Sequence, residues 1–167
     1  MKSKLAQQLV AELTHEAKAT RALLQVVPMD KLDYKPHPKS MTLGRLAVHV
    51  AEISGWVKET ILLDELDFAK MDFKPFEPKT NDELLAFFDK LIKTAQDILN
   101  NATDDDFEKP WTMRTGDQIY FTMPKGIVAR TWCFNHMVHH RAQLGVYLRL
   151  LDVAIPSTYG PTADSKG

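Results

Sequence analysis

Apolar residues recur at helical spacing in four stretches of the chain, and these stretches predict its main elements. They lie between Ser3 and Pro28, between Ser40 or Thr42 and about Leu63, between Thr80 and Asn100–Asn101, and between Pro124 and about Leu151. Within each stretch the apolar positions fall three or four residues apart, which places them on one face of a helix. Thr80 and Glu83 match a capping box, and Pro124 suits a first helical turn.

The segments between these helices favour turns and one short β element. Residues 64–79 contain two prolines and form a connection, whereas residues 111–123 have β-like residues around the turn at 115–117, which favours a small hairpin. The tail, residues 155–161, cannot continue a helix. Four long amphipathic helices predict one all-α domain over residues 1–167, a four-helix bundle with a small hairpin before its last long helix.

Two histidines in the last predicted helix indicate a metal site. His136 and His140 are four residues apart and therefore project from one face, one turn apart. Two imidazoles at this spacing can bind one divalent ion, as in the H-E-x-x-H helices of zinc proteases. Met137 occupies the position of the glutamate base in those proteases. The pattern therefore indicates a metal without indicating a protease, and its alternative is a chance pair on a solvated face.

His49 in the second predicted helix is the third candidate ligand. It lies beside the apolar stripe, on the flank shared with Ile53, Trp56 and Thr60, and Glu52 follows it by three residues as a candidate outer partner. Metal sites in helical bundles use inward side chains of facing helices. Three imidazoles would leave one position open, as in catalytic zinc sites, and would suit a divalent transition metal, zinc or nickel foremost. The alternative is that His49 is an ordinary histidine.

Further polar residues of the last helix have two interpretations each. Gln143 and Tyr147 follow His136 by seven and eleven residues and share its azimuth, so they would lie in the second shell of the metal or line its cavity, or else satisfy buried backbone groups. Cys133, one turn before His136, would be a fourth ligand or, as we favour, a buried core thiol. For Arg141 we favour a structural ion pair.

Composition narrows the classes of function. Lys and Arg number 21 and Asp and Glu 22, for a formal net charge of −1, and no basic run suggests a nucleic-acid partner. The single cysteine excludes an intrachain disulfide and fits a reducing compartment. The N-terminal residues lack a signal-peptide core, and no apolar run approaches the roughly 20 residues that span a bilayer. We therefore expect a cytoplasmic protein that acts on a small molecule, without a membrane partner.

Several motifs together resemble the DinB family of DinB/YfiT-like metalloenzymes. They are YKPHPKSMTLG at 34–44 with the following His49, NHMVHHRAQL at 135–144, and IPSTYGP at 155–161. Many members have glycine where Ala142 stands. The resemblance implies an up-down-down-up four-helix bundle, often dimeric, whose metal is bound by one histidine of the second helix and two of the fourth. Those positions match His49, His136 and His140.

The resemblance also suggests what such a centre does. Relatives include thiol-dependent S-transferases and a mycothiol-dependent isomerase, which favours a metal-dependent enzyme with a low-molecular-weight thiol as cosubstrate. The residues alone fit a metal-dependent hydrolase equally well, because a bound metal can lower the pKa of water to about 7. The third hypothesis is a non-catalytic metal-binding stress-response protein. A homodimer is expected from the resemblance and from the wide apolar face around Leu84, Leu85, Phe87 and Phe88.

Overall fold

The computed structural model describes residues 3–72 and 74–164, which form mainly helices and one small sheet. The helices are α1 Lys4–Gln25, α2 Leu43–Glu52, α3 Trp56–Leu62, α4 Asn81–Asn101, α5 Asp104–Glu108, α6 Lys125–Val128 and α7 His136–Leu150. The strands are β1 Glu65–Asp67, β2 Pro110–Thr115 and β3 Gln118–Pro124. Short 3-10 turns cover Met29–Lys31, Ile53–Gly55 and Phe68–Lys70, and a π-helix covers Ala129–Asn135.

Side-chain caps explain where the long helices begin. The Ser3 and Thr42 hydroxyls accept hydrogen bonds from backbone N–H groups of the first turns of α1 and α2. At α4 the Thr80 hydroxyl accepts from the Glu83 N–H, but the Glu83 carboxylate accepts from the Lys79 N–H at 2.7 Å. Half of the predicted capping box therefore forms, and the other half shifts by one residue.

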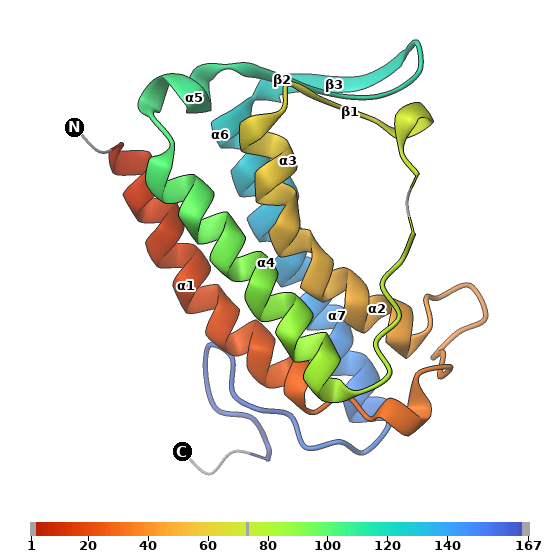
Figure 1. Ribbon diagram of the computed structural model, residues 1–167. Coiled ribbons are helices and arrows are strands. Elements are labelled where there is room, and N and C mark those ends of the chain that lie inside the picture. The colour runs from red at the N-terminus through yellow and green to blue at the C-terminus, as the bar shows by residue number, and fades with distance from the viewer. Residues whose placement is uncertain (1–2, 73, 165–167) are drawn as a thin grey trace.

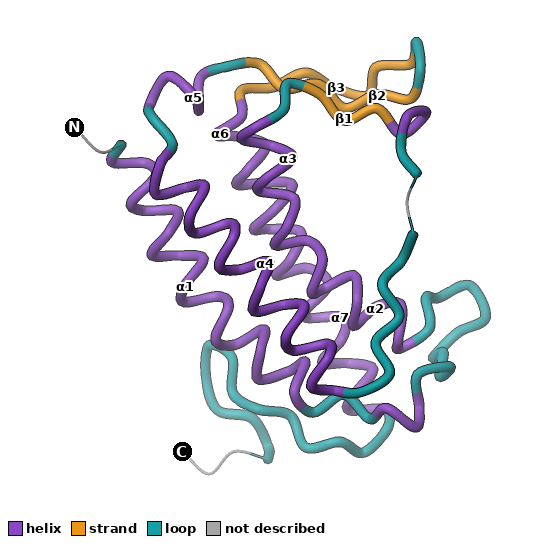
Figure 2. Tube along the Cα trace, in the orientation of Figure 1, coloured by secondary structure: helices purple, strands orange, loops and turns teal. Residues whose placement is uncertain are grey.

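Two of the predicted helices are composite. The second consists of α2, a 3-10 turn and α3, here called the α2–α3 rod (residues 43–62). The fourth consists of α6, the π-helix and α7, here called the α6–α7 rod (residues 125–150). These rods lie alongside α1 and α4, with the sheet at one end and the C-terminal tail at the other (Figure 1, Figure 2).

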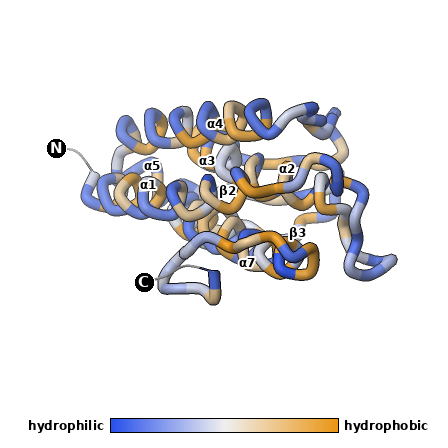
Figure 3. Tube along the Cα trace, turned by 90° about the horizontal axis from the view of Figure 1, so that it is seen from below, coloured by the Kyte–Doolittle hydropathy of each residue, from blue (hydrophilic) through white to orange (hydrophobic). Residues whose placement is uncertain are grey.

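The main core lies between α1, α4 and the two rods. α1 packs on α4, and α2 packs on both α4 and α7. Apolar and polar residues alternate around α1 and α4, so each helix turns an apolar side inward (Figure 3). Fully buried core residues include Leu9, Leu13, Leu24, Leu46, Phe88, Leu99 and Leu148. This core holds the α2–α3 and α6–α7 rods against each other.

The mostly helical prediction is confirmed, and the predicted hairpin is part of a larger sheet. The expected hairpin is present as β2 and β3, which pair antiparallel, but β1 also pairs with β2 in parallel, so the sheet has the order β1-β2-β3. Glu65 of β1 lies opposite Thr112 of β2. The segment after Asp64, predicted to be a connection, is therefore partly a strand. Trp111, Met113 and Val128 form a second small core beneath the sheet.

The apolar face of α4 is largely covered by other parts of the same chain. Leu84, Leu85 and Phe88 are buried, and the Phe87 ring stacks on Phe76 with ring centroids 4.5 Å apart. The width of this face therefore does not argue for a dimer. Among the described residues, none of the helices combines the length and the apolar character needed to span a bilayer.

Candidate metal centre

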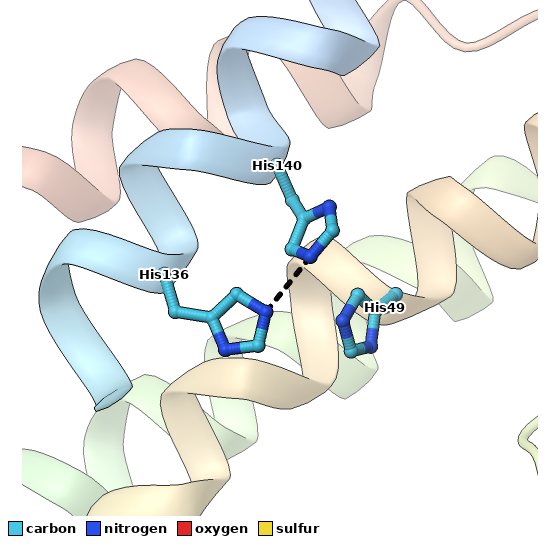
Figure 4. A group of neighbouring side chains, drawn as sticks. All are labelled: His49, His136 and His140. Atoms are coloured by element: carbon cyan, nitrogen blue, oxygen red, sulfur yellow. Dashed lines mark hydrogen bonds between the residues drawn. The ribbon is translucent and has the colours of Figure 1, made fainter. Parts of the chain in front are cut away.

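His49, His136 and His140 lie together between the α2–α3 and α6–α7 rods. α2 carries His49, and α7 carries the other two, which its helical repeat places on one face (Figure 4). One nitrogen of each ring lies within 4.8 Å of the others. The Nε2 atoms of His136 and His140 are 2.8 Å apart, and the His49 ring centroid lies 4.5 Å from that of His140. The histidines of two helices thus form one partly buried cluster.

Acceptors on the same helices orient two of the three rings. His49 Nδ1 lies 2.7 Å from Glu52 Oε1, and His140 Nδ1 lies 2.7 Å from Gln143 Oε1. With a proton on Nδ1, each ring donates to its acceptor and keeps the Nε2 lone pair free to bind a cation. Metal-bound imidazoles are typically held in this way. Arg45 adds another layer, because its Nη2 donates to Glu52 Oε1 at 2.7 Å.

The surroundings of the cluster lower the pKa values of two of its histidines and of Glu52. Burial, followed by the proximity of His140 and His49, lowers the pKa of His136 to about 4. Burial also lowers the pKa of His140 despite the opposing hydrogen bond to Gln143. Burial would raise the pKa of Glu52, but hydrogen bonds from His49 and Arg45 outweigh it and lower that pKa. The lowered pKa values of His136 and His140 favour the unprotonated imidazole, the form that binds metals.

These residues fit a divalent transition metal. Two nitrogens on one tetrahedral zinc ion, each at about 2.05 Å, stand about 3.3 Å apart. The observed 2.8 Å between His136 Nε2 and His140 Nε2 requires only a small rotation of either ring. Three imidazole nitrogens are a donor set suited to zinc, nickel, copper or iron.

A π-helix lies directly before His136, and Trp132 within it contacts the cluster. A π-helix has i→i+5 hydrogen bonds and so a wider turn than an α-helix. Trp132, four residues before His136, contacts its ring at a centroid distance of 5.1 Å. Cys133 instead points into the core, 1% exposed, with Sγ 3.6 Å from Thr60 Oγ1. Burial raises the pKa of Cys133 to about 12, and its sulfur lies outside the three-histidine group.

The remaining candidates divide between the cluster and the scaffold. Gln143 contacts His140, as described, whereas the Tyr147 hydroxyl donates to the Met41 carbonyl at 3.1 Å. Arg141 forms a buried ion pair with Glu16 at 2.7 Å, and this pair does not involve the imidazoles of the cluster. The histidines outside the cluster are exposed, namely His15, His37 and His139.

Sequence reasoning overlooked two residues of this region. Arg45 precedes His49 by four residues and Glu52 by seven, a spacing that puts all three on one helical face. That spacing was a usable signal. Trp132 precedes His136 by four residues, the spacing that also separates His136 from His140, so the helical repeat offered a signal for it as well.

Known proteins match almost the whole chain. A model of the DinB family matches residues 1–166, so the chain belongs to this family. It is 26% identical over 153 residues to the uncharacterized protein YrdA of Bacillus subtilis (strain 168), covering 89% of this chain and 84% of YrdA. A crystal structure of a DinB-like protein from Bacillus cereus ATCC 10987 has a TM-score of 0.70 at 23% identity, covering 92% and 97% of the two chains. Another, of a DinB-family member from Exiguobacterium sibiricum 255-15, has a TM-score of 0.69 at 20% identity, covering 94% and 98%. The structural likenesses establish a DinB-like fold.

Proposed function

We propose that this member of the DinB family is a metal-dependent enzyme that transfers a low-molecular-weight thiol to an electrophilic small molecule. The observation that carries the proposal is the convergence of three imidazoles, two of them oriented through their outer nitrogens. Three protein ligands, rather than four, are typical of catalytic metal sites, where the remaining position serves substrate or water.

Each residue of the cluster has a defined task in this proposal. His49, His136 and His140 would hold a zinc or nickel ion, whose charge favours the thiolate form of a bound thiol over the thiol. Glu52 and Gln143 fix the tautomer and orientation of their histidines. In the transfer a sulfur–carbon bond forms, the leaving group departs with its bonding electron pair, and the proton of the thiol passes to solvent. Cys133 is unsuited as the nucleophile, since burial raises its pKa to about 12.

A metal-dependent hydrolase is the alternative enzyme, and the residue at the position of the motif base weighs against it. Met137, at the position of the protease glutamate, is 1% exposed and buried in the core. Glu52 is already engaged by His49 and Arg45. Attack by a thiolate needs no such base, whereas attack by water requires a group that accepts its proton. The non-catalytic alternative, a metal-binding stress-response protein, predicts a metal with no turnover.

The test combines elemental analysis with a thiol-consumption assay. Purified protein should contain about one divalent ion per chain and consume glutathione, bacillithiol or mycothiol in the presence of a generic electrophile. His136→Ala should abolish the excess rate, while His15→Ala, an exposed histidine on α1, should leave it unchanged. Equal rates for wild type and His136→Ala with all three thiols would overturn thiol transfer, and hydrolysis of ester or amide substrates would then favour the hydrolase.

We also infer the assembly that usually accompanies this family. The packing of α1 on α4 and of α2 on α7 supports an up-down-down-up four-helix bundle. The family resemblance supports a homodimer, whose interface should bury at least roughly 1,000 Å². Light scattering at micromolar concentration should give twice the subunit mass of 19.0 kDa, and the subunit mass alone would contradict a tight dimer.

A further inference from the structure

A cavity of about 370 Å³ lies between the α2–α3 rod, the π-helix and the sheet. Its lining comprises Arg45, His49, Glu52, Trp56, Glu59, Thr60, Leu66, Phe68, Met71, Trp111 and Trp132. His49 belongs both to this wall and to the three-histidine cluster. The Trp56 and Trp132 rings stack with centroids 5.8 Å apart, and each lies 5.1 Å from the His136 ring. The cavity and the candidate metal centre therefore share a wall.

Most polar groups of the lining are already engaged within the protein. Trp111 Nε1 donates to the Glu59 carbonyl at 3.1 Å, and Thr60 pairs with Cys133. Glu52 binds both His49 and Arg45. Besides the Glu59 carboxylate, what the lining offers to a ligand is consequently aromatic and aliphatic surface. Such surface binds through apolar burial and through stacked or edge-on ring contacts.

The charges on the wall argue against an anionic ligand. Glu52 and Glu59 contribute two carboxylates, whereas Arg45 contributes one guanidinium that is paired with Glu52. An anion entering this cavity would lose hydration without gaining an unpaired cation. The volume is at the small end of the roughly 300–1,000 Å³ of ligand pockets, which suits a compound of one or two rings.

We propose that this cavity binds an uncharged aromatic small molecule, and that this molecule is the electrophile that receives the thiol. The second half rests on the proposed function, because only a working metal centre would make the bound molecule a substrate. The first half requires no metal. Trp56 and Trp132 would hold the ring beside the cluster, and Phe68 and Met71, both partly exposed, would form the outer rim.

Binding can be measured in metal-free protein, because all three tryptophans of the chain line the cavity. Nitroaromatic compounds quench tryptophan emission on contact, so 4-nitrobenzyl alcohol and 4-nitrobenzoate form a matched neutral and anionic pair. The alcohol should quench saturably and bind at least tenfold more tightly than the benzoate. Calorimetric titration with 4-nitrobenzyl alcohol should show an affinity at least tenfold lower for Trp132→Ala than for wild type. The affinity of the rim variant Phe68→Ala should fall by a smaller factor. Val146→Ala, exposed on α7, is the control and should bind as wild type does.

Two results would overturn the cavity assignment. They are equal affinity for the two probes, and unchanged affinity in both Trp132→Ala and Phe68→Ala. Phe68→Ala keeps the test decisive should Trp132→Ala fail to fold, since Phe68 is 44% exposed. In the metal-loaded protein, Phe68→Ala should raise KM for 1-chloro-2,4-dinitrobenzene with little change in kcat. Neither KM nor kcat for iodoacetate, which has no ring, should change. If the protein binds the probe but no metal, the proposed function is wrong and the cavity assignment stands. If it transfers thiols but does not bind the probe, the cavity assignment is wrong and the proposed function stands.

Discussion

Two polar clusters lie between the helices, and they are built on opposite principles. In the first, Arg141 donates to Glu16 and Thr20 of α1 and to the Tyr159 hydroxyl of the tail, and Tyr159 donates to Glu16. Opposite charges and matched donors and acceptors complete this cluster. In the second, the three imidazoles present nitrogens of the same kind to one another.

The difference separates a structural cluster from a binding site. Arg141 and Glu16 are almost fully buried, yet each is neutralised by the other, so the group needs nothing from outside. In the histidine cluster, acceptors hold the outer nitrogens of His49 and His140, and one nitrogen of each of the three rings is directed to a common point. Adding protons there brings like charges together, which is one reason that the pKa of His136 falls to about 4. A single cation could be bound by all three lone pairs. This need for an external cation distinguishes the histidine cluster, as a candidate binding site, from the internally neutralised Arg141 cluster.

The largest effect should come from breaking the completed cluster. Arg141→Leu leaves the Glu16 carboxylate buried without its partner, and we expect a loss of about 3–5 kcal/mol in the free energy of unfolding. Urea denaturation of metal-free protein measures it. The double variant Arg141→Leu/Glu16→Leu should recover most of that loss. Lys93→Ala, which removes an exposed pair with Asp97, should change stability little. Similar stabilities for wild type and Arg141→Leu would show that the two clusters do not differ as described.

Breaking the histidine cluster should affect metal binding far more than folding. His140→Ala removes one of three ligands, so most bound metal should be lost in elemental analysis. The free energy of unfolding in the presence of a chelator should change much less than for Arg141→Leu, because no buried charge is left behind. Stoichiometric metal retained by His140→Ala would contradict the assignment of the three ligands.

Removing an orienting group should have a smaller effect. Gln143→Ala frees the His140 ring to rotate, and losses of about 10–100-fold in metal affinity are typical of such outer partners. Competition with a chelating dye measures the affinity of the folded variant. Gln8→Ala, an exposed glutamine on α1, is the matched control. If both variants bind metal as wild type does, Gln143 contributes only to packing.

A separate effect concerns the pH dependence of stability. The pKa of His136 is about 4 when folded and near 6.5 when unfolded, so between these values the unfolded chain binds a proton that the folded chain does not. Metal-free protein should therefore lose stability as pH falls from 6.5 towards 4. The lowered pKa of Glu52 adds to this loss only near and below its usual value of 4.5. Denaturation curves of His136→Gln at several pH values should show a flatter slope above pH 4.5, and an unchanged slope would exclude His136 as the cause.

Features that depend on neighbours along the chain could be read from the sequence. The helix starts follow from the hydroxyls of Ser3, Thr42 and Thr80, since a cap needs only the next backbone turn. The placement of His136 and His140 on one face follows from the helical repeat. Gln143 beside His140 and Glu52 beside His49 are local in the same sense, each three residues away.

Other features required the folded chain. The sequence by itself determined a helical protein with a candidate histidine pair, because backbone hydrogen bonds within a helix join close neighbours. Tertiary structure decided that β1 pairs with β2 from more than 40 residues away, and that a π-helix interrupts the α6–α7 rod just before His136. It also brought three tryptophans from α3, β2 and the π-helix around one cavity. Such contacts depend on how apolar faces pack across the molecule. Because the hydrophobic effect is non-directional, the local sequence does not specify which distant segments will pack together.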